Sequence, residues 1–473
     1  MSTEPPLTPR RDFLGSFATG IGGVALAGLL SRDGLLAGAR ESHYAPRARR
    51  LIHVFLQGGL SHLDSWDHKP RLAKLHGKAM PEEGEKPDVF GKKIGAIHRP
   101  FWEFKQCGQS GLWGSALFPH LREHMDEFAF IKSMTAPSGN HTPATYIANC
   151  GFNELAFPCM GSWISYGLGS ENRDVPGFVV LGDPRGLPSG GPNLWGAGFL
   201  PGQHQGVRFQ SSDNPIDFLN SPRKISEATR RARYRMLEEM NRRHLAERGS
   251  ASDPLRARLA SYELAARMQL AIPGVVELAE ETAQTQALYG MEQDETKDFG
   301  RMCLLARRMV ERGVRVVQLW SGATLAQPTW DSHGELAKDH WREAVRIDRP
   351  LAGLLTDLRQ RGLLDETLVV FSTEFGRTPF TEIEGGKLGS GRDHSQDGFT
   401  NWFAGGGVKG GSEYGATDSL GFRTRENPVS VHDFHATILH LLGIDHTALT
   451  YLHNGFERRL TNVHGHVIDE ILA

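Results

Sequence analysis

The chain has 473 residues, a net charge of -2 and 39% hydrophobic residues. This length allows one large α/β domain or two smaller ones, and the composition excludes collagen-like, coiled-coil and fully disordered chains. Because 53 basic residues are balanced by 55 acidic ones, the charge predicts no nucleic-acid partner, while 21 histidines leave metal or acid–base chemistry open.

The first 39 residues have the features of an export signal. Arg10 and Arg11 precede an uncharged stretch rich in Gly and Ala, residues 13–30, and small residues at 37–39 suit a cleavage site. This pattern predicts a twin-arginine signal peptide at 1–39, recognised by the twin-arginine translocase, and a periplasmic or extracellular mature protein. The alternative is a permanent membrane anchor, which is disfavoured because the stretch is barely long enough to span a bilayer and its glycines weaken a helix.

Runs of apolar and β-branched residues bounded by Gly or polar clusters predict strands along the chain. The predicted strands are Ile52–Leu56, Phe128–Ile131, Phe178–Leu181, Val314–Leu319, Thr367–Ser372 and Asn401–Ala404. Helical patterns lie between them, at Thr142–Asn149, Met160–Leu168, Phe299–Arg312 and Trp341–Arg361. This alternation predicts an α/β fold with a mostly parallel central sheet and helices on both faces, in which functional loops follow the carboxyl ends of the strands.

Two long segments depart from the alternation. Residues 182–206 are rich in Gly and Pro and predict a long ordered loop that is a candidate lid. Residues 221–290 are charged and helical, and their arginines are interspersed with glutamates, so we expect a helical insertion with solvated faces. The mature chain, 40–473, is therefore expected to be a single domain that carries this insertion.

The four cysteines include no CxxC pair, so a thiolate zinc site is not expected. Cys150 and Cys159 are the nearest pair, and export would permit a disulfide between them. Because twin-arginine substrates fold in the reducing cytosol before export, we expect buried free thiols instead.

Five clusters of polar residues lie in loops beside the predicted strands. They contain His62, Asp64 and Asp67; Asn140, His141 and Thr142; Asp331 and His333; Glu374 and Arg377; and Asp393 and His394. Each cluster alone has an ordinary explanation, such as a polar turn or a helix cap. Five of them beside strands indicate a functional site.

The residue types indicate specific roles. Thr142 stands at the start of a predicted helix, where backbone N–H groups favour an anion, and it is either an activated nucleophile or only a helix cap. Asp331 and His333, two residues apart after a buried strand, fit a metal site. Glu374 at a strand end and Arg377 shortly after it fit a metal ligand and an anion-binding guanidinium.

Several segments together resemble an exported bacterial family, the domain of unknown function numbered fifteen hundred and one. They are GGLSHLDSWD, LLARRMVERGVRVVQLW, WDSH, FSTEFGRTPF, GRDHSQDGF, GGGVKGG and RRLTNVHGHVIDEIL, and the resemblance extends from His53 to Ala473. That family is similar to the alkaline-phosphatase-like superfamily, which includes sulfatases, phosphopentomutases and cofactor-independent phosphoglycerate mutases. The resemblance implies a divalent metal site at the carboxyl edge of the central sheet.

The resemblance also implies the metal ligands. Asp331 and His333 match the Asp…His pair of the superfamily, and His394 matches its final His. Glu374 stands where the superfamily has an Asp-His pair, and Asp64 is the displaced counterpart of its early Asp. We expect these five residues to bind or complete a divalent metal site, with zinc as the first choice and calcium, magnesium or manganese as alternatives.

The sulfatase nucleophile motif, Cys-x-Pro-x-Arg, has a counterpart that begins at His141, so the formylglycine precursor is missing and an ordinary sulfatase mechanism is not expected. The resemblance leaves Thr142 or His141 to attack or to position a water, and Arg377 to hold the anionic group. Residues 431–439 also resemble the sulfatase segment that leads into a late helix, and we interpret them as packing.

The sequence therefore predicts an exported, metal-dependent hydrolase of phosphate or sulfate esters, whose substrate is an anionic small molecule or a glycan ester. The alternative is a catalytically degenerate protein that binds an anionic glycan or a partner protein without turnover. Convergence of the candidate side chains on one point would favour the hydrolase.

Overall fold

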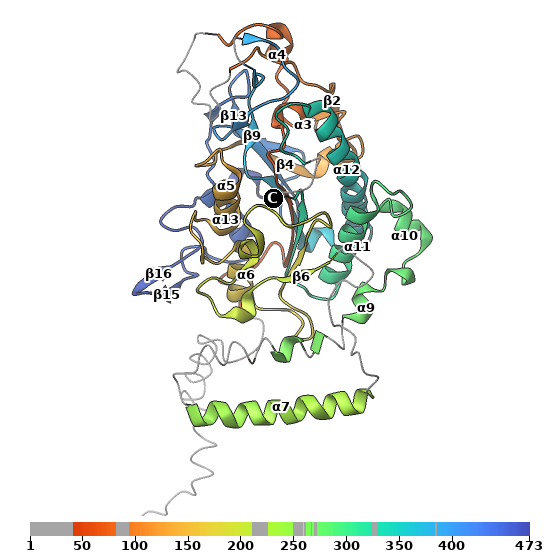
Figure 1. Cartoon of the computed structure of the whole chain (residues 1–473), viewed down its shortest axis with the longest axis vertical. Coiled ribbons are helices and arrows are strands. Elements are labelled where there is room, and N and C mark those ends of the chain that lie inside the picture. The colour runs from red at the N-terminus through yellow and green to blue at the C-terminus, as the bar shows by residue number, and fades with distance from the viewer. Residues whose placement is uncertain are drawn as a thin grey trace, which may run out of the picture.

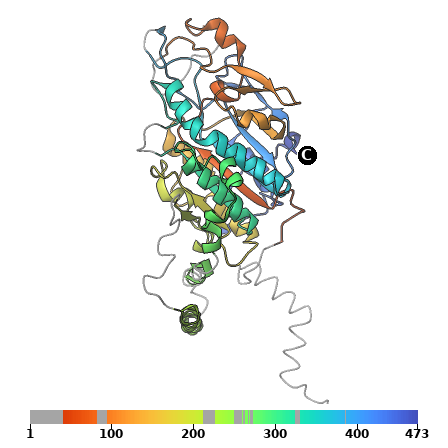
Figure 2. The ribbon, with the colours of Figure 1, turned by 90° about the vertical axis from the view of Figure 1, so that its right-hand side faces the viewer.

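The computed structural model describes residues 41–81, 94–210, 226–248, 259, 262–265, 267–268, 272–323, 329–383 and 386–473. The predicted signal peptide at 1–39 lies outside the described residues. A twisted central sheet runs through the molecule and is flanked by helices on either side (Figures 1 and 2). Among the helices of the described part, none is long and apolar enough to cross a membrane.

The central sheet has eight strands in the order β12-β4-β11-β8-β1-β7-β5-β6. The strands are β1 (Arg50–Leu56), β4 (Phe128–Met134), β5 (Phe178–Leu181), β6 (Val207–Phe209), β7 (Val316–Ser321), β8 (Thr367–Thr373), β11 (Phe399–Gly405) and β12 (Ser412–Tyr414). Strand β11 runs antiparallel to its neighbours β4 and β8, and the other pairs are parallel. The predicted mostly parallel sheet is confirmed.

Strand β1 lies at the centre of the sheet between β7 and β8, and all of it after Arg50 is buried. Strands buried on both faces have continuous apolar sequences, which is why the apolar runs located them. The polar exception is His53, whose Nε2 lies 2.7 Å from Oγ of Ser372 and whose Nδ1 lies 3.2 Å from Nε2 of Gln318. Side chains of both neighbouring strands thus satisfy this buried imidazole.

Each face of the sheet is covered by helices, as predicted. Figure 1 shows α5 (His141–Cys150), α6 (Met160–Leu168) and α13 (Val431–Leu441) on one side and α11 (Lys297–Glu311) and α12 (Leu336–Gln360) on the other. One apolar core packs the first three helices on the β1 side chains Leu51 and Phe55, and a second core packs the other two on Ile52 and Val54. The alternation of β1 side chains between the two cores follows from the two-residue period of a strand.

Helix α12 begins at Leu336, five residues before the predicted start at Trp341. Its first turns carry charged residues, which hide the apolar period, but Leu336, His340 and Ala344 are all fully buried on one face. Buried His340 accepts a hydrogen bond from the backbone N–H of Ser61 at 3.1 Å. Because His340 is polar but buried in the core, the apolar pattern placed the start of this helix too far along the chain.

The remaining elements are short, apart from α7. The small antiparallel pairs are β2 (Phe104–Cys107) with β3 (Leu112–Ser115), β9 (Gly376–Arg377) with β10 (His394–Ser395), β13 (Ala416–Thr417) with β14 (Thr424–Glu426), and β15 (Tyr451–His453) with β16 (Phe456–Arg458). The other α-helices are α3 (His62–Ser65), α4 (Pro70–Leu75), α7 (Glu227–Arg248), α9 (Pro273–Val276) and α10 (Ala283–Leu288). The 3-10 helices are η1 (Leu121–Glu127), η2 (Gly191–Trp195), η3 (Gly202–His204), η5 (Leu278–Glu280), η6 (Leu364–Glu366) and η8 (Asp469–Ile471).

Helices α7, α9 and α10 lie in the stretch predicted as a helical insertion, and Figure 1 shows α7 apart from the sheet. The four cysteines are buried free thiols, as predicted. Burial raises the pKa of the Cys159 thiol to about 11 and that of Cys150 well above its usual value, so neither is a reactive thiolate.

Candidate metal centre

The carboxyl ends of the three central strands lie level with one another. Leu56 at the end of β1 pairs with Ser321 of β7 on one side and with Thr373 of β8 on the other. The loops that follow these strands carry Asp331 after β7 and Glu374 after β8. Parallel strands place such loops at one edge of the sheet, as the prediction required.

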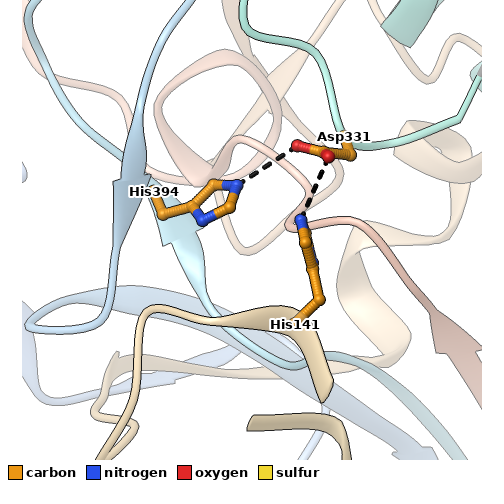
Figure 3. Close-up of side chains that lie close together, drawn as sticks. All are labelled: His141, Asp331 and His394. Atoms are coloured by element: carbon orange, nitrogen blue, oxygen red, sulfur yellow. Dashed lines mark hydrogen bonds and ion pairs between the residues drawn. The ribbon is translucent and has the colours of Figure 1, made fainter. Parts of the chain in front are cut away.

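Three side chains from distant parts of the chain meet at this edge: His141, Asp331 and His394 (Figure 3). Each offers one ligand atom, and these atoms lie within 4.8 Å of one another. Nε2 of His141 is 3.1 Å from Oδ2 of Asp331, and Nε2 of His394 is 3.2 Å from Oδ1 of Asp331. We call these three residues the His-Asp-His group.

Both imidazoles are oriented by their other nitrogen. Nδ1 of His394 lies 2.7 Å from the carbonyl oxygen of Gly139 and must carry the proton there, because a carbonyl only accepts. Nδ1 of His141 lies 2.7 Å from Oε1 of Glu374, which also accepts the backbone N–H of Gly58 at 2.8 Å. Oxygen partners of this kind behind a histidine are typical of metal sites, where they fix the ring with Nε2 toward the ion.

The carboxylate of the group is charged and one of its two imidazoles is neutral. Burial alone would raise the pKa of Asp331, but hydrogen bonds with three histidines and the nearby Arg377 hold it far below its usual range, so Asp331 is a carboxylate. Burial, with the positive charge of Arg377, lowers the pKa of His394 to about 4. A neutral His394 that donates through Nδ1 presents a lone pair at Nε2, which faces a carboxylate oxygen with no proton between them.

His141 carries the compensating charge in the protein without a metal. Burial would lower its pKa, but the close carboxylates of Asp331 and Glu374 outweigh burial and raise it to about 9. Its Nε2 is buried, and its approach to Asp331 lacks good hydrogen-bond geometry. A divalent cation fits in place of that proton, because two imidazole nitrogens and one carboxylate are the ligand types that zinc takes in open sites.

Some of the site residues predicted from the sequence lie in the His-Asp-His group, and others lie around it. Asp331 and His394, both predicted ligands, lie in the group, and His141, predicted to act as nucleophile or base, provides the third ligand atom. Glu374 lies behind His141 rather than in the group. His333 contacts Asp331 through Nε2 at 2.9 Å, and its other nitrogen faces away toward Glu382.

Arg377 is fully buried beside Asp331. Its Nη2 donates to Oδ1 of Asp331 at 2.8 Å, and its remaining hydrogen bonds go to backbone carbonyl oxygens. Those carbonyls belong to Gly58, Gly59, Trp330 and Arg392. The guanidinium predicted to hold a substrate anion is therefore engaged on all its nitrogens and positions Asp331 and the loop after β1.

Asp64 and Thr142 are not among the side chains brought together. Asp64 is on α3, a turn beyond the end of β1, where its buried carboxylate pairs with Nε of Arg392 at 2.9 Å and accepts from Ser61 and Phe101. Thr142 is exposed, and its hydroxyl hydrogen-bonds Oγ of Ser189. Both side chains hold loops at this edge.

Residues 182–206, the candidate lid, are fastened beside the group. The backbone N–H of Ser189 donates to Oε1 of Gln57 at 2.8 Å, and Nε2 of Gln57 donates back to the carbonyl of Ser189 at 3.3 Å. Tyr146 on α5 donates its hydroxyl hydrogen to the carbonyl of Gly190 at 3.0 Å. The loop thus packs on the end of β1 and on the helix that carries His141.

A second group of ligand types, His333, Glu382 and Asp393, lies next to the first. Their ligand atoms are also within 4.8 Å of one another. Sequence reasoning named His333 alone as a ligand. Asp393 carried a weak signal as the neighbour of His394, and Glu382 carried none, because a single glutamate in a loop is ordinary.

Comparisons with known proteins agree with the resemblance seen in the sequence. One family model, described as "Protein of unknown function (DUF1501)", matches residues 48–472, which confirms the predicted family. None of the curated proteins matches the sequence.

Similar solved structures include the PsFucS1 sulfatase from Pseudoalteromonas sp., which is 13% identical with a TM-score of 0.36, covering 95% of this chain and 78% of that one. A mutant of TAB5 alkaline phosphatase is 8% identical with a TM-score of 0.36, covering 84% of this chain and 98% of that one. A protein in the alkaline phosphatase superfamily from Vibrio parahaemolyticus is 11% identical with a TM-score of 0.34, covering 87% of this chain and 70% of that one. At these values the likeness carries no argument about what this chain does.

Proposed function

We propose that this chain, which belongs to the DUF1501 family of proteins of unknown function, is an exported metal-dependent hydrolase of phosphate or sulfate esters. The proposal rests on one observation: two histidines, each held through Nδ1 by an oxygen, direct Nε2 at the same carboxylate. Imidazoles that are held through Nδ1 and directed through Nε2 at a shared carboxylate have the arrangement typical of metal ligands.

The three ligands leave one side of the group open. The side chain of Asp331 is 36% exposed, whereas those of His141 and His394 are 21% and 11% exposed. A divalent cation such as zinc, if held by these ligands, would lower the pKa of a bound water to about 7 and would polarise an ester oxygen. His141, Asp331 and His394 would hold the ion, while Glu374 and Gly139 would keep both rings in place.

The surroundings favour an anionic substrate group. Helix α5 begins at His141, and the preceding Asn140 forms no side-chain cap, so the positive end of a ten-residue helix is directed at the group. Helix N-termini with free N–H groups favour phosphate, sulfate and carboxylate. A phosphate or sulfate ester would place its negative oxygens there.

Water, rather than a side chain, is the attacking group in this proposal. His141 and His394 are used as ligands, and the hydroxyl of Thr142 is bonded to Ser189 instead of to a base. Thr142→Ala should therefore keep much of its rate, whereas His394→Ala should lose both the ion and turnover.

Export is part of the proposal and is supported by the twin-arginine pattern in residues 1–39. The buried free thiols are consistent with folding in a reducing compartment before transport.

The test is a screen of the purified protein, loaded with zinc, manganese, magnesium or calcium, against aryl phosphates and aryl sulfates. We expect turnover of one class, its loss in His394→Ala, and wild-type turnover in the control His244→Ala, because His244 is exposed on α7. A wild-type protein that turns over neither class with any of these ions would contradict the hydrolase and favour an exported protein that binds an anionic glycan or a partner.

A further inference from the structure

We infer that a second divalent cation, zinc or manganese, binds between His333, Glu382 and Asp393, on the side of the His333 ring that faces away from Asp331. Three separate loop segments meet there. His333 lies in the loop after β7, Glu382 follows β9, and Asp393 directly precedes β10. None of these atoms is a ligand in the His-Asp-His group, so the inference does not depend on the proposed activity.

The three ligand atoms form a compact set. They lie within 4.8 Å of one another. Nδ1 of His333 contacts Oε2 of Glu382 and lies 4.0 Å from Oδ1 of Asp393. One imidazole nitrogen and two carboxylates are ligands that suit zinc and manganese.

Asp393 supplies an independent sign that a partner belongs here. Its side chain is buried, with the whole residue 3% exposed, and Oδ1 accepts the backbone N–H of His394 at 2.7 Å. Oδ2 is buried as well, and within the described ranges no donor reaches it. A buried carboxylate with one oxygen lacking a donor costs free energy, and a cation bound by this carboxylate would offset part of that cost.

Positive charge is also missing around the pair of carboxylates. Their ion-pair partner in the part of the chain that the structure describes is His333, and no Lys or Arg there pairs with Glu382 or Asp393. The neighbouring arginines are committed elsewhere: Arg392 to Asp64 and Arg377 to Asp331. Two carboxylates that share one imidazole leave the cluster negative unless a cation joins them.

The cluster is accessible and rigidly framed. The side chains of His333 and Glu382 are 40% and 21% exposed, so an ion can enter from solvent and keep water ligands. The backbone of His333 packs so closely on Gly391 that a Cβ atom there would lie 1.7 Å from the His333 carbonyl oxygen. The loops that carry His333 and Asp393 are thus held together before an ion binds.

The imidazole ring of His333 would connect the second cation to the His-Asp-His group. Nε2 of His333 lies 2.9 Å from Oδ1 of Asp331, the oxygen that also faces His394. An ion at Nδ1 fixes this ring with its Nε2 hydrogen toward Asp331, which orients the shared carboxylate.

The test counts the zinc ions bound by the purified protein, residues 40–473. The ions are counted by elemental analysis after dialysis against buffered zinc and by calorimetric titration. We expect two ions in the wild type and one in Glu382→Gln, whose site is exposed enough for the variant to fold. The control Glu335→Gln removes an exposed carboxylate from the same loop, one that pairs with Lys338, and should bind the same number of ions as the wild type.

A second variant separates this site from the first. His394→Ala should lose the ion of the His-Asp-His group and keep the one at Glu382, so the double variant with Glu382→Gln should bind none. Manganese can replace zinc in the same variants, and electron paramagnetic resonance then reports one or two bound ions. A wild type that binds no ion, or a Glu382→Gln variant that binds as many ions as the wild type, would overturn the inference, whereas a wild type whose single ion is lost in Glu382→Gln would contradict only the first centre.

Discussion

Three fully buried histidines make the stability of this protein dependent on pH. Burial lowers the pKa of His53, His340 and His435 to about 3 in each case. His435 is the best one to perturb, because it lies on α13, contacts none of the candidate ligands, and makes one hydrogen bond, from Nε2 to the carbonyl of Ala148 at 2.9 Å. Its Nδ1 is buried without a partner among the described residues.

The sign of the effect follows from proton linkage. The folded-state pKa of His435 lies below the unfolded value of about 6.5, so its contribution to stability is complete above that pH and is lost as the pH falls toward about 3. At pH 5 the unfolded chain gains about 2 kcal/mol by protonating one such histidine, and about 6 kcal/mol by protonating all three. That sum is comparable to the whole stability of an ordinary domain.

His435→Leu removes this penalty for one site. At pH 8 the variant should be less stable than the wild type by about 1–3 kcal/mol, because the Ala148 carbonyl loses its donor. At pH 5 the wild type carries the protonation penalty and the variant does not, so the difference between them should shrink by about 2 kcal/mol or reverse. Urea unfolding at both pH values, followed by circular dichroism, measures this change.

The matched control is His244→Leu, which removes a histidine exposed on α7. Its stability difference from the wild type should be the same at pH 8 and pH 5 to within the error of the measurement. The reasoning would be refuted if the His435→Leu difference were also unchanged between the two pH values, because the buried imidazole would then be protonated as easily in the folded protein as in the unfolded chain.

Three further predictions concern the site and the export signal. Gly391→Ala should push its loop away from the His333 carbonyl, which should lower the free energy of unfolding in urea by about 1–3 kcal/mol and lower the affinity for the second ion. An unchanged free energy of unfolding would contradict the close approach of the two loops. Glu374→Gln should keep the fold but lower metal affinity at the first centre by about 10- to 100-fold in calorimetry, because the carboxylate that orients His141 is lost; equal affinity would exclude that role. Changing both arginines of the export signal to Lys should leave the protein in the cytoplasm on cell fractionation, and normal export of that variant would exclude the twin-arginine route.

The architecture was readable from the sequence because its central strands are buried on both faces. Such strands have uninterrupted apolar runs, so β5 (Phe178–Leu181) was located to the residue and β1 and β8 within two residues. Helix α6 (Met160–Leu168) was also located to the residue. The predicted start of a helix was wrong where a polar residue is part of the core, as at the start of α12, where His340 is buried.

The candidate site could be predicted only in part. Asp331 was found because it follows a buried strand at the functional edge of the sheet, and His394 was found through its match to the final His of the superfamily. The place of His141 depends on Glu374, 233 residues away, which turns its ring toward Asp331, and no local pattern encodes that contact. Arg377 has the right chemistry for an anion, but four backbone carbonyls surround it, and backbone positions are invisible in a sequence.

The central claim is that His141, Asp331 and His394 hold a divalent ion, and anomalous X-ray diffraction at the zinc edge tests it most directly. A crystal of zinc-loaded protein should show an anomalous peak about 2.0–2.1 Å from Nε2 of both histidines and about 2.0–2.2 Å from an oxygen of Asp331, with Nδ1 of His141 still on Glu374. A zinc-loaded crystal in which these three side chains keep their places without an anomalous peak between them would contradict the account.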